Sequence, residues 1–261
     1  MHTKAKFRFA CEHLVDCRRR GILTDLPQEL SPASRAEGYA IQACLPEITE
    51  DRQLGWKIAA TSAAGQAHIN VDGPIVGRIM FGSVFKSGDS LHLDTNNMRV
   101  VELEFAFCLG KDIPPRTEPY TELEVLDCVS SLHPAMELPN SCYENVTTAG
   151  APKFIADNAA AGQFIFGPAL YPGWRDMDLA AYTVSATVLG KAEFQGTGAN
   201  VLGDPRAALA WMVNELSSHG IPLVKGHMVS TGTCMAPINV VPGDSVIGDF
   251  GILGQLHVHV R

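Results

Sequence analysis

The sequence lacks several patterns that would assign it to a familiar class of protein. No two of its seven cysteines form a C-x-x-C pair, which argues against a zinc ribbon or a redox dithiol and favours reduced thiols. No G-x-G-x-x-G follows an expected strand, so a Rossmann dinucleotide fold is disfavoured. No apolar run reaches membrane-spanning length, and the first residues contain no apolar signal core. We therefore expect a cytoplasmic protein with no membrane partner.

Basic residues are also scarce. The formal net charge is −8, and the densest basic cluster is Arg18–Arg20. We expect this cluster to lie at the exposed end of a helix, and we expect no nucleic-acid partner. The 261 residues, 46% of them hydrophobic, suffice for a substantial core in one large domain or two small ones.

The N-terminal part of the chain has helical patterning. Apolar residues within 6–20 recur at helical spacing, and Gly21 is placed where a glycine ends a helix. Ser34 is positioned to cap a second helix over 35–44. We expect residues 1–53 to form a helical N-terminal cap region.

Residues 54–261 are expected to form a β-rich catalytic core, because short β-type runs alternate with glycine and proline turns. This pattern indicates an α+β protein with a roll or barrel-like body. The expected strands are 55–60, 163–166, 182–189, 227–231, 244–250 and 255–260. The other expected elements are helices over 62–69, 123–132 and 205–216, and a mobile loop over a site at 140–152.

The stretch 100–109, V-V-E-L-E-F-A-F-C-L, is the most informative in the chain. Side chains alternate between the two faces of a strand, so one face here is entirely apolar, whereas Glu102 and Glu104 share the other. Two carboxylates in an apolar strand repel each other and lose hydration unless a cation lies between them. A half-exposed strand without a site would give the same alternation. The apolar surroundings favour a buried metal site.

Two further residues could complete such a site. Glu137 lies in the apolar segment A-M-E-L, and three glutamates with open positions would suit Mg²⁺ or Mn²⁺, which prefer oxygen ligands. Lys57 lies in the strand-like segment G-W-K-I-A. It is either a surface lysine, a cation for a substrate carboxylate, or an amine whose pKa burial lowers for acid–base chemistry. His257 and His259 share a strand face, but with no acidic partner nearby a metal role is disfavoured.

Several segments of the chain together resemble those of a known family. It is similar to the 2-keto-4-pentenoate hydratase group of the fumarylacetoacetate hydrolase superfamily, which includes 4-oxalocrotonate decarboxylases. The resemblance extends from about Tyr39 to the C-terminus and is most specific in E-L-E-F-A-F-C-L-G-K-D-I-P. The matching segments are G-W-K-I-A (55–59), V-D-G-P-I-V-G (71–77), V-E-L-E-F-A-F-C-L-G-K-D-I-P (101–114), A-M-E-L (135–138), I-A-D-N-A (155–159) and V-S-T-G-T (229–233).

The resemblance implies a mixed β-sandwich roll with a small helical N-terminal region, assembled into homo-oligomers. It implies that the three glutamates hold Mg²⁺ or Mn²⁺, and that Lys57 is catalytic. Thr231 matches a threonine that meets the carboxylate end of the substrate, and Asp157 and Asn158 lie in a substrate-binding motif. The implied substrate is a small 2-oxo- or 2-hydroxy-enoate. The family also suggests a complex with a partner enzyme of the same pathway.

Two departures from the family pattern concern the reaction rather than the metal. The hydratases often have P-D-F-G where this chain has P-I-V-G, so an acidic group associated with water addition is replaced by Ile75. Their D-N-A-S becomes D-N-A-A, which removes a hydroxyl at Ala160.

Four functions therefore stay open. The first is a metal-dependent hydratase of a 2-hydroxy-2,4-dienoate in aromatic meta-cleavage catabolism, acting through a metal-stabilised enolate. The second is a 4-oxalocrotonate-type decarboxylase, favoured by a drier pocket. The third is a C–C hydrolase of an acylpyruvate, for which His133 is an unproven candidate base. The fourth is a non-catalytic partner subunit, against which the presence of all three glutamates and Lys57 argues.

Overall fold

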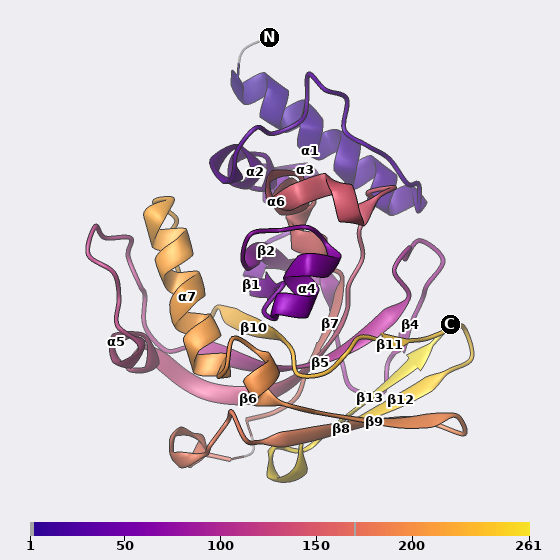
Figure 1. Ribbon diagram of the computed structural model, residues 1–261, viewed down its shortest axis with the longest axis vertical. Coiled ribbons are helices and arrows are strands. Elements are labelled where there is room, and N and C mark those ends of the chain that lie inside the picture. Colours follow the sequence, from indigo (N-terminus) through magenta and orange to yellow (C-terminus); the bar gives the residue numbers. More distant parts are fainter. Residues whose placement is uncertain (1–2, 170) are drawn as a thin grey trace.

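Two β-sheets make up the body of the fold, and a group of helices lies at one end of it (Figure 1). The structure is a computed structural model that describes residues 3–169 and 171–261. The larger sheet has the strand order β2-β1-β10-β5-β6-β7-β3, with the short β11 paired to β5. The smaller sheet has the order β4-β13-β12-β8-β9.

The strands are short apart from two in the middle of the larger sheet. Their bounds are β1 Gln53–Ala59, β2 Ile75–Met80, β3 Val84–Phe85, β4 Ser90–Leu91, β5 Val100–Leu109, β6 Val129–Leu138, β7 Gln163–Phe166, β8 Thr183–Val188, β9 Ala192–Thr197, β10 Met228–Thr233, β11 Ile238–Asn239, β12 Ser245–Asp249 and β13 Gln255–Val260.

The α-helices are α1 Thr3–Arg20, α2 Arg35–Gln42, α3 Leu45–Thr49, α4 Ala63–His68, α5 Glu122–Leu126, α6 Val146–Ala156 and α7 Pro205–Ser218. Single 3₁₀ turns are η1 Phe81–Ser83, η2 Asn158–Ala160, η3 Trp174–Asp176, η4 Gly198–Asn200 and η5 Gly251–Leu253. None of the helices in the described part of the chain has the length and apolar character needed to cross a membrane.

The two ten-residue strands β5 and β6 connect the core to the site. Their antiparallel register pairs Glu102 with Glu137. The apolar face predicted for β5 is buried against the smaller sheet, where the Phe105 and Phe250 rings meet edge to face with centroids 6.0 Å apart. Gly248 of β12 allows this close approach, because a Cβ there would lie 2.5 Å from the methyl group of Met136. One face of β5 thus packs the two sheets together, while the other face carries Glu102 and Glu104.

The N-terminal helices form as their sequence predicts. Helix α1 ends at Arg20, and Gly21 follows with φ +62°, a conformation that glycine adopts without strain. Ser34 caps α2 by accepting a hydrogen bond from the backbone N–H of Glu37. In Figure 1 these helices lie together with α6 at the end of the body that carries the N-terminus.

Three expectations about local structure were wrong. The helix expected over 123–132 ends at Leu126, and β6 begins at Val129, because the long β5 supplies a pairing partner that the local pattern does not show. The loop expected over 140–152 is helical from Val146, with Asn145 as its N-cap. The expectation that Arg18 is exposed also fails, since its side chain is largely buried against residues 157–161.

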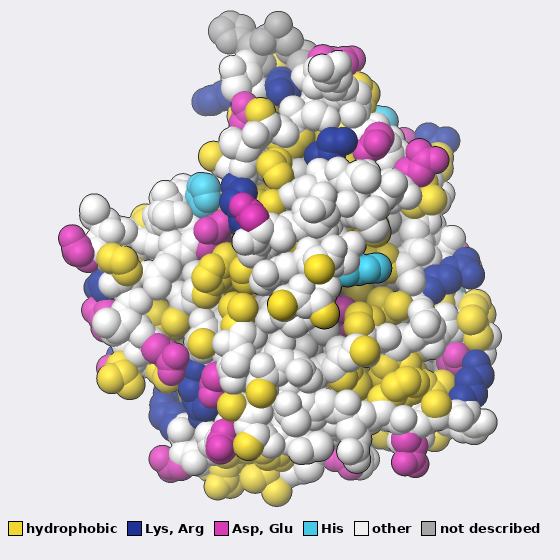
Figure 2. All heavy atoms as spheres, viewed as in Figure 1, with side chains coloured by type: hydrophobic (Ala, Val, Ile, Leu, Met, Phe, Trp, Pro, Cys, Tyr) yellow, Lys and Arg dark blue, Asp and Glu magenta, His cyan; other side chains and the backbone are white. Residues whose placement is uncertain are grey.

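The α+β roll with a helical N-terminal region is confirmed. The division of the chain at residue 53 stays a prediction. One apolar cluster crosses it, since residues of α1 pack there with Cys142, Tyr143 and residues of α6. On the face shown in Figure 2, acidic and basic side chains are interspersed rather than gathered by sign.

Candidate metal centre and active site

Three carboxylates converge on one face of the larger sheet. Glu102 and Glu104 project from the same face of β5, and Glu137 lies opposite Glu102 on β6. One carboxylate oxygen from each residue lies within 4.8 Å of the others. Glu104 and Glu137 are fully buried, and Glu102 is partly exposed. The sheet register therefore brings together residues that are more than thirty positions apart in the sequence.

Lys57 of β1 is the cation of this group. Its Nζ lies 3.2 Å from Oε2 of Glu137 and donates a hydrogen bond of 3.1 Å to the carbonyl oxygen of Ala159. Burial alone would lower the pKa of this amine, but attraction to the three glutamates outweighs burial and raises the pKa. Lys57 is thus an ammonium ion, which agrees with the cation among the three alternatives and not with an amine whose pKa is lowered.

Burial raises the pKa of all three carboxyl groups. The pKa of Glu102 rises to about 7, because burial and repulsion from Glu104 together outweigh the attraction of Lys57. The pKa of Glu137 is raised well above its ordinary value, by burial first and by the other two glutamates in addition. When ionised, three carboxylates and one ammonium leave two negative charges in excess, which matches one divalent cation.

Buried carboxylate oxygens without hydrogen-bond donors also indicate that the site fits a cation. Among the described residues, Oε1 of Glu104 is buried without a hydrogen-bond partner, and Oε2 of Glu137 has only the ion pair with Lys57. A buried acceptor without a partner is costly, and a cation would satisfy it. The donor set is entirely carboxylate oxygen, which suits a hard divalent ion and not zinc.

Glu104 is held in place by Ser230, a residue that was not predicted from the sequence as part of the site. Ser230 Oγ donates a 2.5 Å hydrogen bond to Oε2 of Glu104, and the Gly232 N–H donates one of 3.0 Å to the same oxygen. Both donors belong to β10, the neighbour of β5. Ser230 lies in the V-S-T-G-T segment that matches the family. This segment contains three hydroxyl groups, and alternation alone does not show which of them faces the glutamates.

Thr231, the residue expected to meet the substrate, has a different contact in the structure. Its buried Oγ1 donates to the carbonyl oxygen of Phe105 at 2.9 Å. This hydrogen bond uses the only hydroxyl proton and leaves the oxygen able to act as an acceptor alone. Contact between Thr231 and a substrate stays a proposal.

We expect Ser230→Ala to weaken Mn²⁺ binding about 10-fold, within the range of about 10–100-fold typical of residues that orient a metal ligand. The reason is that Glu104 loses its strongest oriented donor. Titration monitored by electron paramagnetic resonance would measure the affinity. Ser130→Ala is the matched control, because Ser130 is an exposed serine whose hydroxyl donates to the Cys108 carbonyl oxygen. Equal affinity in the two variants would contradict this role for Ser230.

A left-handed turn borders the site. Asn158, Ala159 and Ala160 have φ values of 55°, 50° and 55° in succession, although none is glycine. Such a conformation costs about 1–2 kcal/mol per residue, so surrounding contacts must maintain it. The turn presents the Ala159 carbonyl oxygen to Lys57, and three residues after Ala159 the Gly162 N–H donates to Oε1 of Glu137 at 3.1 Å.

The side chains of Asp157 and Asn158 are occupied by the protein itself. Asp157 Oδ2 accepts from Ser141 Oγ at 2.7 Å and from the Cys142 N–H at 3.1 Å, and Oδ1 pairs with Arg18. Asn158 makes two hydrogen bonds to the backbone of Arg78, one through each end of its amide. These contacts make both residues supports of the turn, and direct binding of substrate by them stays a prediction.

The histidines considered from the sequence do not join the carboxylates. His133 lies on β6 four residues before Glu137, about 13 Å along an extended strand. Both of its ring nitrogens have partners, Gly167 O and Ser131 Oγ. His257 and His259 are exposed on β13. The arrangement does not support His133 as a base near the glutamates.

The metal-free protein should become less stable as pH rises. Because the folded-state pKa of Glu102 is about 7 against an ordinary 4.5, the folded state binds more protons between these values. The free energy of unfolding therefore falls as pH rises through this interval, and a cation that binds the ionised carboxylates reverses the loss. We expect Mg²⁺ to raise the melting temperature more at pH 8 than at pH 6. Equal shifts in a calorimetric comparison would contradict this, and Glu102→Gln should reduce the difference.

Solved structures identify the fold. The 4-oxalocrotonate decarboxylase from Pseudomonas putida G7, complexed with magnesium and adipate, superposes with a TM-score of 0.87 at 23% identity, over 100% of this chain and 99% of that one. A fumarylacetoacetate hydrolase family protein from Yersinia pestis CO92 gives a TM-score of 0.58 at 15% identity, over 79% of this chain and 92% of that one. The fold is that of the fumarylacetoacetate hydrolase superfamily.

Sequence comparison identifies the family within that superfamily. The 2-keto-4-pentenoate hydratase of Paraburkholderia xenovorans is 32% identical over 215 residues, which cover 80% of this chain and 77% of the relative. No family model matches the sequence. The chain belongs to the 2-keto-4-pentenoate hydratase family, a family of lyases, and this confirms the resemblance inferred from its motifs.

Proposed function

We propose that this protein is a metal-dependent hydratase of a 2-hydroxy-2,4-dienoate in the catabolism of aromatic compounds. The observation that carries the proposal is the convergence of Glu102, Glu104 and Glu137 with the Lys57 ammonium in a buried site. The family supports it, since its named members include hydratases of 2-keto-4-pentenoate and of 2-hydroxyhexa-2,4-dienoate. We propose Mg²⁺ or Mn²⁺ as the cation, held by the three glutamates.

Lys57 has a defined part in this reaction. When bound, the cation supplies Lewis-acid stabilisation of the negative charge that develops as a 2-oxo acid enolises. The Lys57 ammonium adds a second positive charge and a proton donor in a buried setting, where electrostatic interactions are strong. Its raised pKa suits donation of a hydrogen bond or a proton to the enolate, because a base would have to be neutral.

The other residues fix the positions of these groups. Ser230 and Gly232 hold the Glu104 carboxylate, so the ligand does not need to reorient when the cation binds. The turn at 158–160 fixes Lys57 through the Ala159 carbonyl oxygen. We propose that Thr231 contributes its hydroxyl oxygen to the substrate-binding surface.

Product analysis by NMR would test the proposal. The purified protein with Mg²⁺ would be incubated with 2-hydroxypenta-2,4-dienoate, 2-hydroxyhexa-2,4-dienoate and 4-oxalocrotonate. We expect a 4-hydroxy-2-oxo acid from at least one dienoate, and no conversion after removal of the metal with EDTA. Release of CO₂ from 4-oxalocrotonate without any hydrated product would contradict the hydratase assignment.

Decarboxylation of a 2-oxo-3-enedioate is the second candidate. Ile75 and Ala160, which replace the acid and the hydroxyl that the hydratases often carry, are both buried among apolar residues. Fewer polar groups to hold a water molecule favour loss of CO₂ over attack by water. The same enolate site serves both reactions, so the product analysis above separates them.

The family also motivates proposals about the setting of the enzyme. We propose that it acts in the cytoplasm as a homo-oligomer and can associate with a partner enzyme of its pathway. Sedimentation of the purified protein, alone and with such a partner, would test the assembly.

A further inference from the structure

We propose that Arg18 of α1 is a positioning residue of the active site, acting through the left-handed turn at 158–160. The part of this inference that concerns kcat rests on the proposed function. The part that concerns Mn²⁺ affinity rests on the metal centre alone. It assigns a part in the site to the N-terminal helix α1, which belongs to the region predicted from the sequence to be a helical cap.

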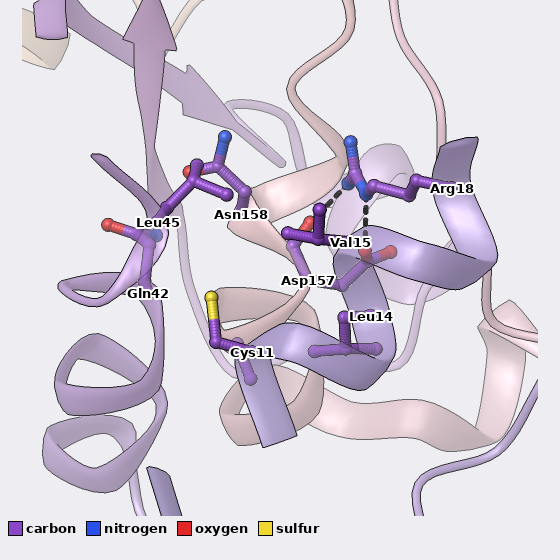
Figure 3. Close-up of a pocket in the computed structure, with 9 residues that line it drawn as sticks. Cys11, Leu14, Val15, Arg18, Gln42, Leu45, Asp157 and Asn158 are labelled. Atoms are coloured by element: carbon purple, nitrogen blue, oxygen red, sulfur yellow. Dashed lines mark hydrogen bonds and ion pairs between the residues drawn. The ribbon is translucent and has the colours of Figure 1, made fainter. Parts of the chain in front are cut away.

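Arg18 binds both ends of the turn. Its Nε donates to Oδ1 of Asp157 at 2.5 Å, and its Nη2 donates to the Asp157 carbonyl oxygen, just before the turn. Its Nη1 donates to the Ala161 carbonyl oxygen at 2.6 Å, just after the turn. Figure 3 shows the Arg18 side chain extending from α1 to Asp157 beside a small cavity. All three guanidinium nitrogens thus donate to the five-residue segment 157–161.

The turn needs such a restraint. Three successive non-glycine residues in the left-handed region store strain of about 1–2 kcal/mol each, and the segment would relax if its ends were released. The planar guanidinium fits this task, because its donors lie in a fixed fork that a lysine cannot reproduce. Asn158 restrains the turn from the other side, through the backbone of Arg78.

The restraint reaches the reacting groups in one further step. The Ala159 carbonyl oxygen accepts from Lys57 Nζ, and the Gly162 N–H donates to Glu137. Relaxation of the turn would therefore displace the acceptor of the catalytic lysine and the donor to a metal ligand together. Arg18 makes its hydrogen bonds to Asp157 and Ala161 and none to the three glutamates, so its positioning effect passes through the backbone of 157–162, while its charge also attracts Glu137 directly.

The test compares Arg18→Ala and Arg18→Lys with Arg20→Ala in the full chain. Arg20 is the matched control, because it lies on the same helix in an exposed pair with Asp16 at 3.0 Å. For Arg18→Ala we expect about 10-fold weaker Mn²⁺ binding and a kcat about 10–100-fold lower, as for residues that orient metal ligands. KM should stay within about threefold of wild type, because the substrate contacts are unchanged. Arg18→Lys should be intermediate, and Arg20→Ala should match wild type.

Two measurements separate positioning from loss of folding. Added guanidinium ion should restore kcat to Arg18→Ala and leave Arg20→Ala unchanged, and the Gly162 amide should exchange with solvent faster in Arg18→Ala alone. A folded Arg18→Ala with wild-type Mn²⁺ affinity and wild-type kcat would overturn the proposal, as would an Arg18→Lys indistinguishable from wild type. If wild type binds Mn²⁺ but converts no dienoate, the proposed function fails while the Mn²⁺ comparison still tests Arg18.

Discussion

Glu104→Gln should abolish metal-dependent activity and weaken Mn²⁺ binding by at least about 100-fold, because even residues outside the ligand set change metal affinity by about 10–100-fold. The substitution keeps the size of the side chain and one acceptor oxygen for Ser230 and Gly232, so their hydrogen bonds persist. It removes the charge from a fully buried carboxylate whose pKa is already raised by burial. Calorimetric titration and turnover with a dienoate would measure the two losses.

The stability of this variant gives the control. Removing one of three mutually repelling carboxylates should leave the metal-free variant at least as stable as the metal-free wild type, although Mg²⁺ should no longer raise its melting temperature. Glu193→Gln, at an exposed glutamate of β9, should behave as wild type in every assay. Retention of tight Mn²⁺ binding by Glu104→Gln would remove this glutamate from the metal centre.

Lys57→Met should lower kcat about 1,000-fold, at the middle of the range of about 10²–10⁴ for loss of a proton-transfer group. It should also destabilise the metal-free protein by about 3–5 kcal/mol, the usual cost of removing one partner from a buried ion pair, here that of Lys57 with Glu137. The destabilisation should shrink when Mg²⁺ is present, since the cation takes over the neutralisation. Single-turnover kinetics and chemical denaturation would measure the two effects.

Lys191→Met is the matched control for this substitution. Lys191 forms an ion pair of 2.6 Å with Asp244, and its side chain is 53% exposed, so removing it should cost at most about 1 kcal/mol. Its kcat should equal that of wild type. A folded Lys57→Met with wild-type kcat would contradict the assignment of Lys57 to proton transfer.

Alternation along residues 100–109 predicted the central strand and its two faces. It could do so because one face of β5 is entirely apolar and lies toward the smaller sheet, whereas the other face carries the two carboxylates. The apolar segment around Glu137 predicted the third glutamate, but only the register of β6 shows that it lies opposite Glu102. The pairing partner of a strand can lie far away in the sequence. For the same reason the helix was wrongly expected to continue beyond Leu126, where β6 pairs with β5 instead.

The contacts around the turn could not be predicted. Nothing in D-N-A-A indicates three successive left-handed residues, since alanine rarely adopts that conformation and the neighbours that maintain it are distant in sequence. Arg18 lies 139 residues before Asp157. A basic cluster at the end of a helix is usually solvated, and only the fold shows that one of its three members turns inward.

An anomalous difference map from crystals grown with Mn²⁺ would show directly whether Glu102, Glu104 and Glu137 hold the cation. We expect one strong peak between the carboxylates of Glu102, Glu104 and Glu137, with the Lys57 ammonium close by but not bound to the ion. The same map for Glu104→Gln should lack the peak. A strong peak elsewhere, with none between these glutamates in crystals of wild type, would contradict the account.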